Sequence, residues 1–201
     1  MHPSSRQITS LYQTHGAAWA QNRTKALIER HWLDAFLGNM PTGPKTVLDI
    51  GCGTGDPIAR YLIDNSCQIT GLDGASNMTA AARATFPDHD WVTADMRQIP
   101  DIGPFNGLIA WHSFFHLPPD DQRRMFPTFR RLATLGAPLM FTSGTEAGEA
   151  IGMLEGEPLY HASLDTAEYQ SLLAKHGFTV LHHLENDPAC GSANIWLAQR
   201  L

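Results

Sequence analysis

A chain of 201 residues, 43% of them hydrophobic, is long enough to bury the core of one domain, and we predict a single domain over residues 1–201. Its 14 basic and 20 acidic residues give a net charge of −6, which argues against a nucleic-acid-binding surface. Residues 1–6 lack the apolar run of a signal peptide, and no stretch of the chain is apolar enough to cross a membrane. The three widely spaced cysteines indicate a reducing compartment, so we expect a cytoplasmic protein with no membrane or nucleic-acid partner.

The first 40 residues are predicted to form a helical cap ahead of the first strand. Ile8, Leu11 and Tyr12 share one face of a short helix. Apolar residues recur at three-to-four spacing through 17–37, which predicts a second, longer helix that ends at Gly38. The cap therefore occupies residues 1–40 of the domain.

Strands and helices alternate from residue 46 onward. The apolar runs predict strands over residues 46–50, 68–73, 91–94, 107–111 and 138–142. Between them, helices are predicted to begin near Pro57, at a cap region around Ser76, and near Pro118. Alternating strands and helices require parallel pairing with right-handed crossovers, so we expect helices to cover both faces of the sheet.

The pattern changes after the fifth predicted strand. Residues 144–163 form a long connection, which we interpret as a substrate-side loop because long connections in compact domains often bind ligands. A helix then begins at Asp165, with Glu168 as its capping-box partner. Two further strands are separated only by a turn-rich connector and must therefore pair antiparallel; they span residues 178–184 and 193–199.

A glycine turn follows the first predicted strand, and the rest of the chain is organised around it. The run Val47-Leu48-Asp49-Ile50-Gly51-Cys52-Gly53-Thr54-Gly55 has glycines at alternate positions, where the backbone bends sharply and approaches a ligand closely. The NAD-binding pattern fails because Asp56 stands at its third glycine, and the Walker pattern fails because no Gly-Lys-Ser/Thr follows. From the motif alone, another nucleotide-binding domain or a degenerate doubly wound domain remains an alternative.

This run resembles the first motif of the class I S-adenosylmethionine-dependent methyltransferases, in particular a subgroup that acts on small molecules. The likeness covers the chain from about Thr46 to Leu201. It implies an α/β fold, a doubly wound, seven-stranded, mostly parallel sheet with a C-terminal antiparallel hairpin and a helical N-terminal cap. It also implies S-adenosyl-L-methionine as the cofactor and a small-molecule methyl acceptor as the partner, and it indicates no oligomeric state.

Three acidic residues fall at the ends of three successive predicted strands, where doubly wound folds bind their ligands. A carboxylate at Asp73 has the geometry to accept both hydroxyls of a ribose. The resemblance assigns the ammonium group of the cofactor to Asp49 and its adenine amine to Asp95. The predicted cofactor-binding residues are Asp49, Gly51, Cys52, Gly53, Asp73, Gly74, Asp95, Met96, Trp111 and Tyr12.

The segment after the fourth predicted strand holds the candidate catalytic residues. His116 is the first choice for a general base and His112 the second, because imidazole titrates near neutral pH. The alternative is that His116 is a packed, hydrogen-bonded loop residue. The two histidines are four residues apart, but no acidic residue or cysteine nearby completes a metal site, so we predict no metal. The predicted substrate-contacting residues are Phe115, Tyr160 and His161.

We therefore predict methyl transfer to an oxygen or nitrogen of a small molecule, in which the protein mainly positions the nucleophile. The resemblance makes Tyr12, Trp19 and Arg23 of the cap candidates to face the site, although these side chains would equally well pack on the sheet. The Asn/Asp-Pro-Pro-Tyr/Phe signature of nucleic-acid amino-methylating enzymes is absent, and the segment 112–115 stands in its place. Two alternatives stay open: a methyltransferase of proteins or RNA, and a scaffold that binds the cofactor without turnover.

Overall fold

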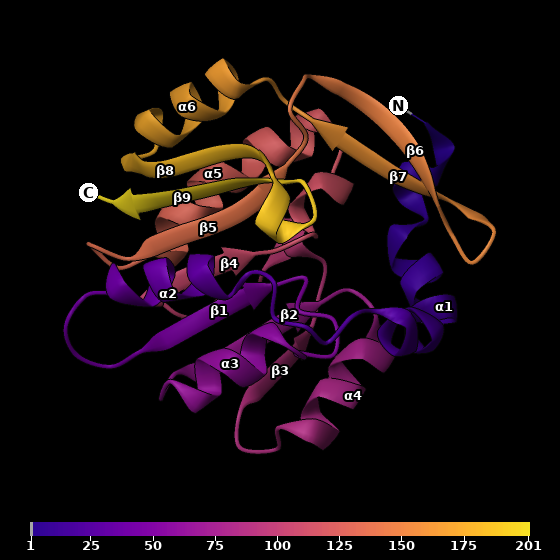
Figure 1. Cartoon of the computed structure of the whole chain (residues 1–201), viewed down its shortest axis with the longest axis horizontal. Helices are drawn as coiled ribbons and strands as arrows, with labels where there is room; N and C mark the ends of the chain where they lie inside the picture. The colour runs from indigo at the N-terminus through magenta and orange to yellow at the C-terminus, as the bar shows by residue number, and fades with distance from the viewer. Residues whose placement is uncertain (1) are drawn as a thin grey trace.

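The computed structural model describes residues 2–201 and contains a seven-stranded sheet with helices packed on both faces (Figure 1). The strands are β1 (Thr46–Ile50), β2 (Gln68–Asp73), β3 (Asp90–Thr93), β4 (Gly107–Ala110), β5 (Pro138–Ser143), β8 (Phe178–Asp187) and β9 (Ala193–Arg200). Their order is β3-β2-β1-β4-β5-β9-β8. β9 runs in the direction opposite to the other strands of this sheet, so its pairs with β5 and β8 are antiparallel. The predicted α/β fold with a C-terminal antiparallel hairpin is confirmed. Met1, the first residue of the predicted cap, lies outside the described residues.

Successive residues of the inner strands face opposite sides of the sheet and enter two separate cores. The helices are α2 (Arg30–Gly38), α3 (Ile58–Asp64), α4 (Ser76–Thr85), α5 (Pro119–Leu132) and α6 (Thr166–Lys175). On β1, Leu48 and Ile50 pack in the core that includes residues of α5 and α6. Val47, the residue before Leu48, packs in the other core, which includes residues of α2, α3 and α4. Burial on both faces explains why the parallel strands read as continuous apolar runs.

The N-terminal cap differs from its prediction. One long helix over 17–37 is wrong, because the chain forms η1 (Pro3–Arg6), α1 (Ile8–Asn22) and then α2, with a break between them. Arg23 adopts an extended backbone conformation and ends α1. After residues 24–29, α2 begins where Trp32, Leu33 and Phe36 become buried against the sheet. The gain from burying those side chains outweighs the continuation of one helix.

Residues 144–163, expected to be a loop, contain an antiparallel hairpin formed by β6 (Gly148–Leu154) and β7 (Glu157–Ser163). The connecting residues Glu155 and Gly156 both have positive φ, 51° and 85°, as a tight two-residue hairpin turn requires. Glu-Gly is an unusual pair at this turn, so the sequence of residues 144–163 does not predict a hairpin. Figure 1 shows this second sheet standing apart from the main one, beside α1.

The predicted helix caps have different outcomes. Asp165 caps α6 as predicted, because its side chain accepts a hydrogen bond from the N–H of Glu168 at 2.7 Å. The Ser76 cap is wrong, since Ala75 is the N-cap residue of α4 and has no side chain that accepts a hydrogen bond. Ser76 instead donates its N–H to the Gln13 side-chain oxygen at 2.8 Å, which ties α1 to the start of α4.

Gln122 on α5 joins three elements through a fully buried amide. Its Nε2 donates to the carbonyls of Leu117 (2.8 Å) and Ala162 (2.9 Å), and its Oε1 accepts from the Tyr169 hydroxyl (2.5 Å). We expect Gln122→Leu to lower the free energy of unfolding by about 2–4 kcal/mol, because these partners are left buried and unpaired. Urea unfolding measures this change, and Gln170→Leu, at an exposed position of α6, is the matched control. Equal stability of the two variants would contradict the assignment.

No helix within residues 2–201 combines the length and the apolar character that a membrane crossing requires.

Candidate active site

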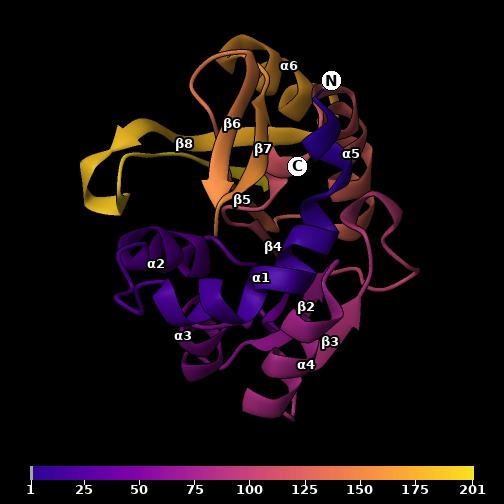
Figure 2. The same ribbon diagram turned by 90° about the vertical axis from the view of Figure 1, so that its right-hand side faces the viewer.

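Two adjoining cavities lie at the carboxyl ends of the central strands. Figure 2 shows α1 lying across these strand ends. The first has a volume of about 110 Å3 and the second about 300 Å3. The first lies against the glycine turn after β1 and the ends of β2 and β4. The second lies between α1, the segment after β4 and β7. They share the wall residues Tyr12, Trp19, Arg23, Trp111, His112 and His116.

Most of the predicted cofactor-binding residues meet in the first cavity. Those that line it are Tyr12, Gly51, Gly53, Asp73, Gly74, Asp95, Met96 and Trp111. Asp49 and Cys52 line neither cavity. The Cys52 thiol is buried, and burial raises its pKa well above the usual value. Ser5, Thr9 and Met78 also line the first cavity, although no sequence pattern distinguishes them from other cap and helix residues.

Glycine at position 51 is required by packing within the protein. Gly51 has φ +77°, and a Cβ there would lie 2.2 Å from the Cβ of Ser113. Ser113 is buried and donates its hydroxyl to the carbonyl of Ile50 at 2.5 Å. The glycine turn and the segment after β4 are therefore held against each other. Gly53, with φ +55°, donates its N–H to the carboxylate of Asp73 at 3.0 Å.

Asp73 is held at the end of β2 by two backbone donors. Its carboxylate accepts hydrogen bonds from the N–H of Gly53 at 3.0 Å and of Ala75 at 2.8 Å. Burial raises the pKa of Asp73 above its usual value, and the two hydrogen bonds oppose that rise. The side chain is thus fixed in orientation and borders the first cavity.

Asp49 is a buried carboxyl group without a hydrogen-bond partner among residues 2–201. Its side chain is 3% exposed at the end of β1. Burial raises its pKa to about 7, the positive charge of Arg23 opposes this, and the negative charge of Asp73 adds to it. An ionised carboxylate in this position is costly unless a cation approaches it. The site therefore favours a ligand that brings a positive charge to Asp49.

Asp95 is bound to an arginine that the sequence did not single out. The Arg97 guanidinium donates to both carboxylate oxygens, with Nε 2.9 Å from Oδ1 and Nη2 2.5 Å from Oδ2. These side-chain hydrogen bonds lower the pKa of Asp95. Arg97 also reaches Asp121 on α5 at 3.3 Å. A ligand that hydrogen-bonds to Asp95 must therefore share this carboxylate with Arg97.

His116 has one defined tautomer. It ends η3 (Phe114–His116), and its Nδ1 lies 2.8 Å from the carbonyl oxygen of Tyr160. Because a carbonyl only accepts hydrogen bonds, Nδ1 carries the proton and Nε2 has the lone pair. The Tyr12 hydroxyl lies 3.2 Å from Nε2 and is therefore the donor in that contact. Burial lowers the pKa of His116 to about 4, so the ring is neutral at pH 7.

His112 and His161 complete a wall of neutral imidazoles around Phe115 in the second cavity. His112 directly follows β4 with φ +50°, an uncommon conformation for a residue with a side chain. Its N–H donates to the Thr142 hydroxyl at 2.9 Å, and burial lowers its pKa to about 4. The Phe115 ring lies 5.8 Å from His112 and 5.2 Å from His161, centroid to centroid. The predicted substrate-contacting residues Phe115 and His161 therefore line the second cavity.

Tyr160 is placed differently from the other predicted substrate-contacting residues. Its side chain is fully buried and lines neither cavity. Burial and the nearby Glu149 raise its pKa to about 12. Its contribution to the candidate site is the backbone carbonyl that fixes the tautomer of His116.

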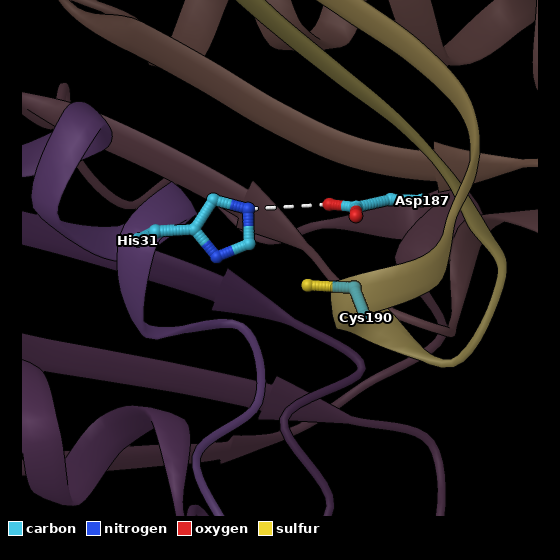
Figure 3. Close-up of side chains that lie close together, drawn as sticks. All are labelled: His31, Asp187 and Cys190. Atoms are coloured by element: carbon cyan, nitrogen blue, oxygen red, sulfur yellow. Dashed lines mark hydrogen bonds and ion pairs between the residues drawn. The ribbon is translucent and has the colours of Figure 1, made fainter.

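One group of three potential metal ligands occurs within residues 2–201, outside the walls of the two cavities (Figure 3). The ligand atoms of His31, Asp187 and Cys190 lie within 4.8 Å of one another. Asp187 already accepts hydrogen bonds from His31 (3.2 Å) and from the Trp32 indole (2.8 Å), and the Cys190 thiol lies 3.3 Å from the carbonyl of Ile28. These contacts attach η4 (Pro188–Cys190) to α2 and explain the cluster as a structural junction. The sequence offers no signal for it because His31 is far from Asp187 and Cys190 along the chain.

The comparisons with known proteins agree with this geometry. Residues 47–136 match the family model described as a methyltransferase domain. This match covers less than half of the chain, and it agrees with the resemblance to the class I S-adenosylmethionine-dependent methyltransferases that the sequence predicts. This family uses S-adenosylmethionine as its cofactor.

Individual known proteins are similar to this chain over parts of their length. The malonyl-[acyl-carrier protein] O-methyltransferase of Enterobacter lignolyticus is 39% identical over 74 residues, which are 36% of this chain and 29% of that protein. An O-methyltransferase of Pyrenophora dematioidea is 26% identical over 181 residues, 81% of this chain and 66% of that protein. The chain thus spans less than two thirds of the length of these curated relatives.

Solved structures of known proteins share the fold of this chain. The magnesium protoporphyrin IX methyltransferase of Synechocystis, with S-adenosylmethionine bound, superposes with a TM-score of 0.74. The match covers 100% of this chain and 99% of that chain at 16% sequence identity. At this identity the likeness establishes the fold.

Proposed function

We propose that this protein is a class I S-adenosylmethionine-dependent methyltransferase, which transfers a methyl group from S-adenosylmethionine to an oxygen or nitrogen atom of a small molecule. The observation that carries the proposal is the pair of adjoining cavities at the carboxyl ends of the strands. Asp73 and Asp95, at two of the strand ends, line the first cavity, and the neutral imidazole of His116 borders both cavities. The three free, buried cysteines support the cytoplasmic location that we propose with it.

The residues of the first cavity fit the cofactor. Asp49 does not line this cavity, but its carboxyl, buried at the end of β1 and without a hydrogen-bond partner among residues 2–201, suits an ammonium group. Asp73 suits the ribose hydroxyls, because two backbone N–H groups already fix its orientation. Asp95 and Met96 offer an acceptor and an apolar surface for the adenine. When bound, the cofactor supplies a methyl group activated by a sulfonium.

The pair formed by Tyr12 and His116 suits the handling of a proton. Nε2 of His116 faces the shared wall with its lone pair available, because Nδ1 is fixed as the donor to Tyr160. A hydroxyl or amine that displaces the Tyr12 contact would give its proton to Nε2 as it accepts the methyl group. The neutral ring also adds no positive charge next to a cationic cofactor.

The second cavity supports a small acceptor. It has a volume of about 300 Å3, and residues of α1 and β7 form part of its wall. Ring side chains form most of its wall, and such surfaces bind compact molecules with few polar groups. A protein or RNA acceptor, and a scaffold that binds the cofactor without turnover, are the alternatives that the experiment below distinguishes.

The test measures cofactor binding and turnover separately. We expect the protein to bind S-adenosylhomocysteine in calorimetry and to release it from S-adenosylmethionine when a small-molecule metabolite extract is added. Binding without release across a broad extract would favour the scaffold. Release only with a macromolecular fraction would favour a protein or RNA acceptor, and no binding would refute the proposal.

Asp73→Ala tests the assignment of the first cavity. We expect it to weaken S-adenosylhomocysteine binding by about 1.5–3 kcal/mol, because charge-assisted hydrogen bonds to the ribose are lost. Asp64→Ala removes an exposed carboxylate at the end of α3 and is the matched control. If calorimetry gives the same dissociation constant for both folded variants, Asp73 does not bind the ribose.

A further inference from the structure

The second cavity contains a buried carboxylate that the proposed function does not yet use. Glu29 is the N-cap residue of α2 and is 2% exposed, and it lines this cavity. Its carboxylate accepts no hydrogen bond within residues 2–201. The Arg23 guanidinium lies 3.6 Å away, which makes an ion pair but is longer than a hydrogen bond. A buried carboxylate with so little compensation is costly to keep, which indicates a ligand partner.

Arg23 is shared between several groups. Its guanidinium stacks on the Trp19 ring at 5.2 Å from the centroid, and its charge lowers the pKa of Asp49. Within residues 2–201 it is the only cationic side chain, histidines aside, that borders both cavities. A zwitterionic cofactor brings a carboxylate, and Arg23, which lines the first cavity, is a suitable partner for it. Glu29 is then the one charged side chain of the second cavity left for the acceptor.

The rest of the second cavity suits a cation as well. Trp19, Trp111 and Phe115 line this cavity, and an aromatic ring attracts a positive charge that lies over its face. The histidines in its wall are neutral at pH 7 and do not repel a cation. An anionic acceptor, by contrast, would have to draw Arg23 away and would lie next to an unpaired carboxylate.

We propose that Glu29 binds a protonated amine on the methyl acceptor, so that the acceptor is an aromatic or apolar molecule carrying a basic nitrogen. This inference rests on the proposed function, because it takes the second cavity to be the acceptor site. It specifies the chemical class of the acceptor, which the oxygen-or-nitrogen assignment leaves open.

The experiment uses the full chain saturated with S-adenosylhomocysteine and three probes that share one phenol ring. Tyramine is the cation, 4-ethylphenol the neutral analogue and 3-(4-hydroxyphenyl)propionate the anion. Calorimetry is expected to give an affinity for tyramine about tenfold or more above that for either analogue. Glu29→Gln should lower the tyramine affinity about tenfold and leave the 4-ethylphenol affinity unchanged. Glu157→Gln, which removes an exposed carboxylate from β7, is the matched control.

Several outcomes would overturn this inference. They are equal affinities for the three probes, tighter binding of the anion, no measurable binding of any probe, and a Glu29→Gln variant with unchanged tyramine affinity. An equal loss of all three affinities would show that Glu29 only supports the cavity wall. The wild-type comparison decides the matter even if the variant does not fold. Failure to bind S-adenosylhomocysteine refutes the proposed function and this inference together, whereas normal cofactor binding without preference for the amine refutes only the inference.

Discussion

Replacing His116 with glutamine is expected to lower kcat by about 10²- to 10⁴-fold, the usual contribution of a positioned general base. The lone pair on Nε2 is lost, and with it the acceptor for the proton that leaves the nucleophile. Cofactor binding should persist, because the predicted contacts to the cofactor come from other residues. The measurement is initial-rate kinetics with the acceptor that supports S-adenosylhomocysteine release, together with calorimetry of S-adenosylhomocysteine.

Two further variants separate catalysis from structure in this experiment. His15→Gln, on α1 outside both cavities, is the control for losing an imidazole. Tyr12→Phe removes the hydroxyl that donates to Nε2 but leaves the base intact, so it should reduce kcat less than His116→Gln. Because burial lowers the pKa of His116 to about 4, protonation of this ring should not limit the wild-type rate above pH 5. An unchanged kcat in a folded His116→Gln variant would show that His116 is a structural residue.

Binding of S-adenosylhomocysteine is expected to strengthen about tenfold per pH unit as pH rises toward 7, and to level off above it. The cofactor's ammonium group binds the ionised form of Asp49, whose pKa burial raises to about 7. Proton release must therefore accompany binding below that pH. Tyr12, with a pKa raised to about 12, does not titrate near pH 7. The same holds for His112 and His116, whose pKa values burial lowers to about 4. Asp49→Asn should bind weakly and without this slope in calorimetry.

The Asp49→Asn substitution, which should weaken cofactor binding, should stabilise the protein without cofactor at high pH. The folded state holds a proton on Asp49 up to about pH 7, whereas the unfolded chain loses it near 3.8. The stabilisation that the protonated Asp49 gives is therefore complete below the pKa of Asp49 in the unfolded chain. It is lost as the pH rises through the pKa of Asp49 in the folded protein. Asp49→Asn should match the wild type near pH 4 and be more stable at pH 8 by roughly up to 4 kcal/mol. Equal urea midpoints at pH 8 would contradict the raised pKa.

The predictions that succeeded depend on local sequence. Strands buried on both faces appear as apolar runs, and an acidic residue directly after such a run must lie at the sheet edge where ligands bind. Asp73 and Asp95 were located in this way, as was the cap at Asp165. The glycine turn is a local signal as well, since the positive φ of Gly51 is a conformation that glycine adopts most readily.

The hairpin of β6 and β7 and the break between α1 and α2 were missed because tertiary contacts decide them. Burial of Trp32 and Phe36 fixes where α2 begins. The hairpin of β6 and β7 packs against η1 and α1, which are distant from it along the chain. Local propensity is a weak guide in both segments.

The sequence by itself determined the fold class, the strand ends and the identity of the acidic groups, because these follow from short-range patterns of burial and turn chemistry. Only the tertiary structure decided which groups face one another. Tyr12 meets His116 across 104 positions of the chain, and Arg23 approaches Glu29 across a helix break that propensity does not reveal. The protonation states also belong to the tertiary structure, since burial, which no single segment sets, moves the pKa of Asp49 and of His116 in opposite directions.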